Sequence, residues 1–197
     1  MASRSDIRAS LTIPNLITLA RILLTPLFII FLIQGQYRKA LIVFLLAGLS
    51  DLADGLVARR WHQKSPLGAY LDPLADKLLM SASFVALSVA RAIPPWLTVA
   101  VLSRDLTMAL GVVIFRLADL PLNISPTRLG KWTTTLQIFT ILMVLVGKIW
   151  PLPKLTFLLL FWLTGGLTVL SGVHYIIRGL LLMSQSQGPS GKDGGLG

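Results

Sequence analysis

The sequence contains no cysteine and no glutamate, and it has only two histidines, His62 and His174. The absence of cysteine excludes a disulfide framework, a thiolate metal site and a cysteine nucleophile. The scarcity of histidine argues against a zinc site built from several imidazoles. All eight acidic residues are aspartates, so a metal site in this chain would use oxygen ligands.

Charge is also scarce. Only 13% of the 197 residues are charged, whereas a soluble globular domain has about 25%. Because 54% of the residues are apolar and the mean hydropathy is +0.77, the composition favours a lipid environment. The net charge of +10 comes from bases that lie mainly between apolar runs. This placement favours the positive-inside rule and attraction to anionic lipid, and no nucleic-acid partner is expected, since basic and aromatic residues do not alternate.

Apolar stretches of spanning length predict an all-α integral membrane protein with six transmembrane helices in one domain, residues 13–183. The stretches cover residues 14–33, 40–58, 71–90, 95–117, 129–146 and 155–182. Residues 1–12 predict a short interfacial helix, and residues 184–197 predict a disordered tail. Pro73 predicts that the third helix starts late or kinks there. The long last stretch can tilt or break at Gly165-Gly166 or at Gly172.

The distribution of basic residues predicts the orientation. Both termini and the even-numbered connections carry more bases, namely Arg4, Arg8, Arg59, Arg60, Lys64, Arg116, Arg128, Arg178 and Lys192. The other side carries Arg38, Lys39, Arg91, Lys148 and Lys154. The excess predicts a multi-pass protein of the inner (cytoplasmic) membrane with both termini in the cytoplasm.

Four aspartates lie on two neighbouring apolar stretches. Asp51 and Asp54 are near the end of the second predicted span, and Asp72 and Asp76 are near the start of the third. Ionisable groups in a span are costly, so they indicate a functional site. The short connection predicts an antiparallel helical hairpin, and spacings of three and four place each pair on one helix face. If these faces meet, the four carboxylates share one cavity at the cytoplasmic side of the bundle.

A divalent cation would relieve the repulsion among these carboxylates. Oxygen ligands suit Mg²⁺, Mn²⁺ or Ca²⁺, and four carboxylates suit two ions. Gly55, Ala58 and Gly68 leave space for a ligand, and the neighbouring Arg59, Arg60 and Lys64 favour a phosphate or pyrophosphate. The alternative is that the small residues serve helix packing and that a carboxylate at a helix end faces interfacial water.

These residues form the pattern D-x2-D-G-x2-A-R-x8-G-x3-D-x3-D, which resembles the signature of the CDP-alcohol phosphatidyltransferase family. All eight fixed positions are present: Asp51, Asp54, Gly55, Ala58, Arg59, Gly68, Asp72 and Asp76. The resemblance extends from the first to the fifth predicted span. It implies a transferase of phospholipid biosynthesis that moves the phosphatidyl group of CDP-diacylglycerol to an alcohol and releases CMP.

The resemblance also implies roles for individual residues. Asp51, Asp54 and Asp72 should hold the metal, which is expected to be two Mg²⁺ ions, with Mn²⁺ as the alternative. Asp76 should complete the metal site and act as the general base on the acceptor hydroxyl. The CDP-lipid should contact Asp54, Gly55, Ala58, Arg59 and Gly68. The resemblance further implies a homodimer.

Cations outside the signature predict a phosphorylated acceptor. The candidate acceptor-binding residues are Asn15, Thr18, Arg21, Arg104, Arg128 and Lys131. An arginine inside a span indicates function. The alternatives are that Arg104 pairs with Asp105 or with an acid such as Asp51, and that Arg128 and Lys131 are ordinary interfacial anchors.

Two acceptors follow from the resemblance. The Ile13-Pro14-Asn15 start is similar to phosphatidylglycerophosphate synthases and to cardiolipin synthases. The predicted acceptor is glycerol 3-phosphate, which would give phosphatidylglycerophosphate. The alternative is phosphatidylglycerol, because Ser103-Arg104-Asp105 and Ala47-Gly48-Leu49 are more similar to mitochondrial-type cardiolipin synthases.

Two non-enzymatic classes remain as alternatives. An ion-coupled membrane transporter would use membrane aspartates, but it predicts broken helices and an inverted repeat, and the sequence shows no repeat. A lipid-binding scaffold would not need four carboxylates. The aspartate pattern therefore favours an enzyme.

Overall fold

The computed structural model describes residues 13–61, 66–117 and 127–186, with side chains for residues 18–50, 74–117, 127–182 and 184. In these parts the chain forms six α-helices and no β-strand. They are α2 (Ile13–Ile33), α3 (Tyr37–Trp61), α4 (Pro66–Val89), α5 (Pro95–Leu117), α6 (Arg128–Ile149) and α7 (Lys154–Ser186). The predicted all-helical architecture is confirmed. The predicted interfacial helix at residues 1–12 lies outside the described residues.

The prolines and glycines of the predicted spans do not interrupt the helices. The third predicted span starts at Pro66 rather than at residue 71, and α4 continues through Pro73. Pro66 stands at the first position of α4, where the missing N–H of proline has no intrahelical partner to lose, whereas Pro73 is the eighth residue of the helix. The predicted late start at Pro73 is therefore wrong. The last helix is continuous across Gly165 and Gly166 and extends to Ser186, three residues into the segment predicted as a tail.

Close helix contact, rather than flexibility, explains one of these glycines. A Cβ atom on Gly165 would lie 2.3 Å from the indole of Trp96 on α5. A larger residue here would require the Trp96 indole to move, so glycine at this position allows α7 to pack against α5 in this arrangement. Gly35 has a different role, because its φ of +69° forms the tight turn between α2 and α3.

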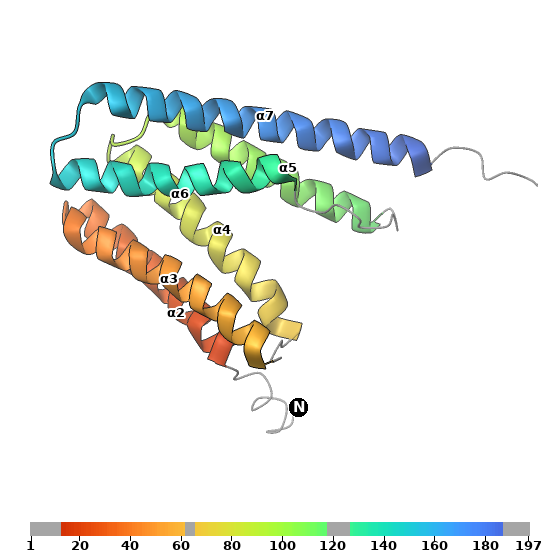
Figure 1. The fold of residues 1–197 in the computed structure, drawn as a ribbon, viewed down its shortest axis with the longest axis horizontal. Helices are drawn as coiled ribbons and strands as arrows, with labels where there is room; N and C mark the ends of the chain where they lie inside the picture. Colours follow the sequence, from red (N-terminus) through yellow and green to blue (C-terminus); the bar gives the residue numbers. More distant parts are fainter. Residues whose placement is uncertain (1–12, 62–65, 118–126, 187–197) are drawn as a thin grey trace, which may run out of the picture.

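Consecutive helices run in opposite directions along the bundle (Figure 1). The connections 34–36, 90–94 and 150–153 lie together at one end. The end of α3 and the start of α4 lie at the opposite end, where α2 begins. Helix α2 packs against both α3 and α4, while α7 packs against α5 and α6, and α3 contacts α6. The two helices that carry the signature aspartates are therefore joined through α2.

The buried core lies between these helices, and the outer faces are apolar. Phe28, Phe44, Phe84 and Leu145 are almost completely buried, whereas α7 exposes leucines such as Leu159. Within the residues described, α5, α6 and Lys154–Leu182 of α7 are long and apolar enough to cross a membrane, and Thr18–Ile33 is a shorter apolar helix. Exposed apolar faces of this extent indicate contact with lipid rather than with water.

A polar seam joins α6 to α7 inside this apolar bundle. The hydroxyl oxygens of Thr140 and Thr164 are 2.7 Å apart, and the Gln137 amide donates to Thr168 Oγ1 at 3.2 Å. The side chains of all four residues are buried. Because lipid offers no alternative partners, such hydrogen bonds fix the register of neighbouring helices. The sequence indicates this seam by polar residues at helical spacing, at positions 133, 137 and 140 on α6 and at positions 164, 168 and 171 on α7.

Candidate active site

A cavity of about 370 Å³ lies among α2, α3, α4 and α6. Three polar side chains line it, those of Arg21, Asp76 and Thr134. The other lining residues are Phe44, Leu45, Ala47, Gly48, Leu49, Leu79, Met80, Ile138 and Leu142. A mostly apolar cavity with a few converging polar groups is typical of a ligand site. Asp76, the last aspartate of the signature, is therefore beside a space that a ligand can enter.

Arg21 and Asp76 form an ion pair in this cavity. Arg21 is 1% exposed, and its Nη1 donates to Oδ1 of Asp76 at 2.5 Å, while Asp76 is 46% exposed. Thr18, Arg21 and Thr25 share one face of α2, and Thr25 donates its hydroxyl to the Arg21 carbonyl. The contact brings together residues that are 55 positions apart, namely the predicted base and a predicted acceptor-binding cation.

For the remaining signature residues and Asn15, the structure gives the position along a helix but no side-chain contact. Asp51, Asp54, Gly55, Ala58 and Arg59 lie on the last turns of α3. Gly68 and Asp72 lie on the first turns of α4, and Asn15 lies on the first turn of α2. These side chains are outside the described set, so the convergence of the four carboxylates stays a prediction. Their helical spacing, on which that prediction depends, is present.

The donor set suits a hard divalent cation. The four signature carboxylates offer only oxygen, and Asp76 presents a half-exposed carboxylate to the cavity. Among the side chains described here, no three potential ligands come together, because only Asp76 of the four falls in that set. Mg²⁺ usually binds through one or two carboxylates together with substrate phosphates, which fits a carboxylate beside an open cavity.

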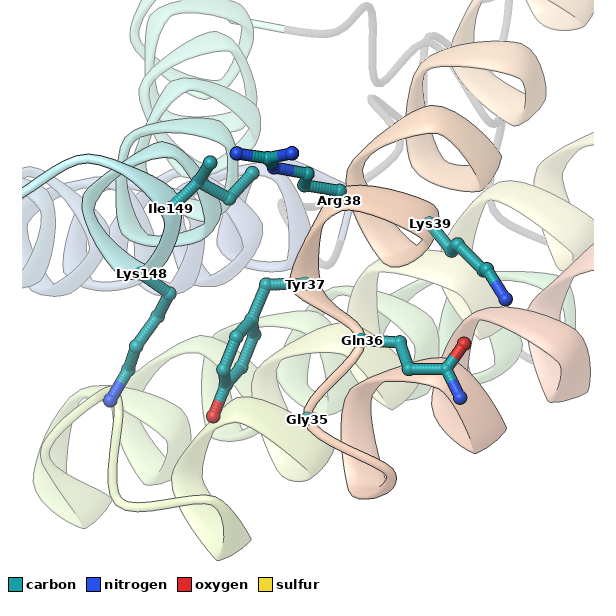
Figure 2. Close-up of a pocket in the computed structure, with 7 residues that line it drawn as sticks. All are labelled: Gly35, Gln36, Tyr37, Arg38, Lys39, Lys148 and Ile149. Atoms are coloured by element: carbon teal, nitrogen blue, oxygen red, sulfur yellow. The ribbon is translucent and has the colours of Figure 1, made fainter.

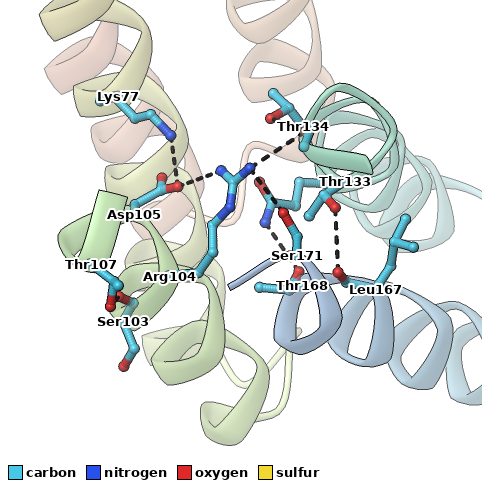
Figure 3. Close-up of polar contacts among 12 residues, drawn as sticks. Lys77, Ser103, Arg104, Asp105, Thr107, Thr133, Thr134, Leu167, Thr168 and Ser171 are labelled. Carbon is cyan, nitrogen blue, oxygen red and sulfur yellow. Dashed lines mark hydrogen bonds and ion pairs between the residues drawn. The ribbon is translucent and has the colours of Figure 1, made fainter. Parts of the chain in front are cut away.

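Arg104 occupies a second polar cluster, between α5, α6 and α7 (Figure 3). It is 5% exposed, and its Nη1 donates to Oδ1 of Asp105 at 2.8 Å. Its Nη2 is 3.5 Å from both the Gly130 carbonyl and the Ser171 hydroxyl. The pairing with Asp105 that the sequence offered as an alternative is present. Arg104 does not line the cavity of Arg21 and Asp76, and its buried Nε has no hydrogen-bond partner among the described atoms.

Lys77 links this cluster to the cavity. Its Nζ is 2.6 Å from the same oxygen of Asp105, and it directly follows Asp76 on α4 (Figure 3). Asp105 thus forms one ion pair with Lys77 of α4 and another with Arg104 of its own helix α5. Lys77 and the cavity residue Thr134 were not among the predicted site residues. Asp105 is the single acidic residue of the fourth apolar stretch, and a carboxylate inside a span needs a cation nearby. This requirement was the signal in the sequence that pointed to a partner such as Lys77.

Arg128 and Lys131 lie at the exposed start of α6. Thr127 caps this helix, since its hydroxyl accepts a hydrogen bond from the Gly130 N–H at 3.1 Å. Neither basic side chain is among those that line the cavity. Gly130 connects the two sites, because its carbonyl accepts hydrogen bonds from Arg104 and from Thr134.

Comparison with known proteins adds independent evidence. The family CDP-alcohol phosphatidyltransferase matches residues 11–172. A cardiolipin synthase (CMP-forming) from Rattus norvegicus is 34% identical over 83% of this chain and 59% of its own length. The cardiolipin synthase (CMP-forming) from Homo sapiens is 35% identical over 77% of this chain and 56% of its own length. The chain therefore spans less than two thirds of these relatives.

A bacterial relative is covered more completely. The CDP-diacylglycerol--glycerol-3-phosphate 3-phosphatidyltransferase of Pseudomonas fluorescens is 34% identical over 84% of this chain and 89% of its own length. The matched region contains α3, α4 and the cavity with its Arg21–Asp76 pair. The chain belongs to the CDP-alcohol phosphatidyltransferase family.

Proposed function

We propose that this protein transfers the phosphatidyl group of CDP-diacylglycerol to the hydroxyl of a phosphate-bearing glycerol compound and releases CMP. The observation that carries the proposal is the Arg21–Asp76 contact inside a cavity of about 370 Å³. The acceptor oxygen forms a bond to the lipid phosphorus, and the P–O bond to CMP breaks. The acceptor proton goes to Asp76.

The contact suggests how the two residues cooperate. The planar guanidinium of Arg21 suits bidentate binding of a phosphate. An acceptor phosphate held by Arg21 would bring the acceptor hydroxyl close to Asp76, within the reach that a general base needs. Asp54, Gly55, Ala58, Arg59 and Gly68 would hold the CDP-lipid, as the family signature implies.

Asp51, Asp54, Asp72 and Asp76 would hold two Mg²⁺ ions, with Mn²⁺ as the alternative. When bound, the ions supply charge neutralisation for the pyrophosphate. The chain's own contribution is to orient the acceptor against Asp76 and to exclude water with the apolar wall formed by Phe44, Met80 and Leu142.

Glycerol 3-phosphate is the first candidate acceptor, since Arg21 can bind its phosphate. Asn15 and Thr18 on the same helix, with Arg104, Arg128 and Lys131, are the other proposed acceptor-binding residues. Because the last three do not line the cavity, they would bind a part of the acceptor that lies outside it. Phosphatidylglycerol is the second candidate, and the apolar cavity wall favours it because a lipid acceptor brings acyl chains. The names of the human and rat relatives point to the same alternative.

The arrangement in the membrane is also part of the proposal. All six described helices would span the inner membrane, with the signature aspartates at the cytoplasmic side and both termini in the cytoplasm. The excess of bases around the α3–α4 connection supports this orientation. A homodimer is expected from the family resemblance.

The acceptor can be identified by assaying the purified protein with CDP-diacylglycerol, Mg²⁺ and one acceptor at a time. We expect CMP release with glycerol 3-phosphate and the appearance of phosphatidylglycerophosphate. Cardiolipin formed from phosphatidylglycerol would instead establish the second candidate. If no acceptor releases CMP while the protein stays folded, the transferase proposal is wrong.

Removing divalent metal should abolish turnover reversibly. Four carboxylates in one cavity need a cation to relieve their repulsion, so we expect activity to vanish in EDTA and to return with added Mg²⁺. Ca²⁺ provides a comparison, because it prefers six to eight ligands and a looser geometry than Mg²⁺. Full activity in EDTA would contradict the metal assignment.

A further inference from the structure

The cavity that contains the Arg21–Asp76 pair has a closed side and an open side. On α2 and α4, the lining residues Arg21, Leu79 and Met80 are buried. On α3 and α6, by contrast, four of the lining residues are exposed, namely Leu45, Gly48, Leu49 and Ile138. Because α3 and α6 contact each other, the cavity opens sideways between these two helices.

The start of α3 gives the depth of this opening in the membrane. Tyr37, Arg38 and Lys39 lie there with Lys148 around a separate basic pocket (Figure 2). In the proposed membrane arrangement this end is at the lipid–water interface, where tyrosine is enriched. Gly48 is eleven positions further along α3, which is about 16 Å at the helical rise and roughly half of a hydrocarbon core of about 30 Å. The opening at Gly48 therefore faces the hydrocarbon of the bilayer.

Gly48 has no side chain at the place where the cavity opens. A Cβ atom built on it would meet no atom within 4 Å, whereas a Cβ on Gly165 would collide with the indole of Trp96. Neither close helix packing nor a positive φ requires glycine at position 48. Glycine is also a poor helix former. Its structural effect here is to keep the mouth of the cavity wide.

The cavity combines a polar end with an apolar part, as a phospholipid does. Arg21 and Asp76 form the polar end. On α6 the lining residues Thr134, Ile138 and Leu142 are four positions apart, so the cavity extends along two helical turns, about 12 Å. An acceptor phosphate held by Arg21 would therefore have space for an acyl chain beside it, with access from the bilayer.

We propose that Gly48 is a specificity-determining residue, which lets the cavity take an acyl chain of a phospholipid acceptor, namely phosphatidylglycerol. The assignment rests on the proposed function, in which Arg21 and Asp76 bind the polar part of the acceptor. Glycerol 3-phosphate has no acyl chain and needs only the polar end of the cavity. The two candidate acceptors therefore depend on Gly48 to different extents.

Filling the opening tests this role. The full-length variant Gly48→Phe is assayed for CMP release with CDP-diacylglycerol, Mg²⁺ and either phosphatidylglycerol or glycerol 3-phosphate. We expect the ratio of kcat/KM for phosphatidylglycerol to kcat/KM for glycerol 3-phosphate to fall by about tenfold or more, because the loss of space for even one methylene has effects of this size. Gly48→Ala adds only a Cβ, for which there is room, and should lower the ratio by less. This milder variant keeps the test valid where phenylalanine impairs folding.

Gly166→Phe is the matched control. Gly166 is exposed on α7, its added Cβ would also meet no atom within 4 Å, and it does not line the cavity. This variant should keep the wild-type ratio. An equal fall with both acceptors in the Gly48 variants would assign the opening to a chain of the donor lipid and overturn the proposal. So would an unchanged ratio, or a wild-type protein that uses glycerol 3-phosphate but not phosphatidylglycerol. CMP release with neither acceptor would overturn the proposed function itself, and this assignment with it.

Discussion

Replacing Asp76 by asparagine should lower kcat by about a thousandfold, because general-base catalysis contributes factors of this size. Asparagine keeps a carbonyl oxygen that can accept the hydrogen bond from Arg21, so the buried guanidinium retains a neutral partner. The fold should therefore persist while proton transfer is lost. CMP release and binding of CDP-diacylglycerol, both measured on purified protein, separate the two effects.

The control for this variant is Asp193→Asn, which makes the same chemical change outside the region matched to the family. It should leave kcat unchanged. If Asp76→Asn loses CDP-lipid binding as well as turnover, Asp76 acts mainly as a metal ligand. If it keeps normal turnover, the assignment of Asp76 as the base is wrong.

The helices were predictable because hydrophobicity in this chain is organised in long runs with prolines between them. The fourth predicted span, residues 95–117, coincides with α5. The end of α3 and the start of α4 extend beyond the predicted spans, to Trp61 and from Pro66, because Arg59, Arg60 and Gly68 interrupt the apolar pattern there. A helix can continue through polar residues, so hydropathy alone underestimates its length.

The site was predictable in its composition but not in its contacts. The aspartate spacing identified the signature, since that information is local to two helices. The contact of Arg21 with Asp76 depends on how α2 packs against α4, which periodicity within either helix does not specify. For Arg104 the sequence left two partners open, and the structure selects Asp105 together with groups on α6 and α7.

Replacing Asp105 by alanine should destabilise the bundle by about 3 kcal/mol or more, because it leaves a buried charge without its partner. Arg104 is 5% exposed and Asp105 is 10% exposed, so few water molecules can reach the guanidinium to replace the lost carboxylate. Thermal unfolding in detergent, followed by circular dichroism, measures the change. The same variant should lower activity, since Lys77, the neighbour of Asp76, loses its link to α5.

Two comparisons separate the buried charge from the surface contact. Lys77→Ala removes only the half-exposed partner and should cost about 1 kcal/mol or less. The double variant Arg104→Met with Asp105→Leu removes both buried charges and should recover most of the stability, because an apolar pair leaves no uncompensated charge. If Asp105→Ala is no less stable than Lys77→Ala, Arg104 does not depend on Asp105. Recovered stability in the double variant with turnover below that of Lys77→Ala, which also lacks the Lys77–Asp105 contact, would show that Arg104 serves the reaction, as its proposed contact with the acceptor requires.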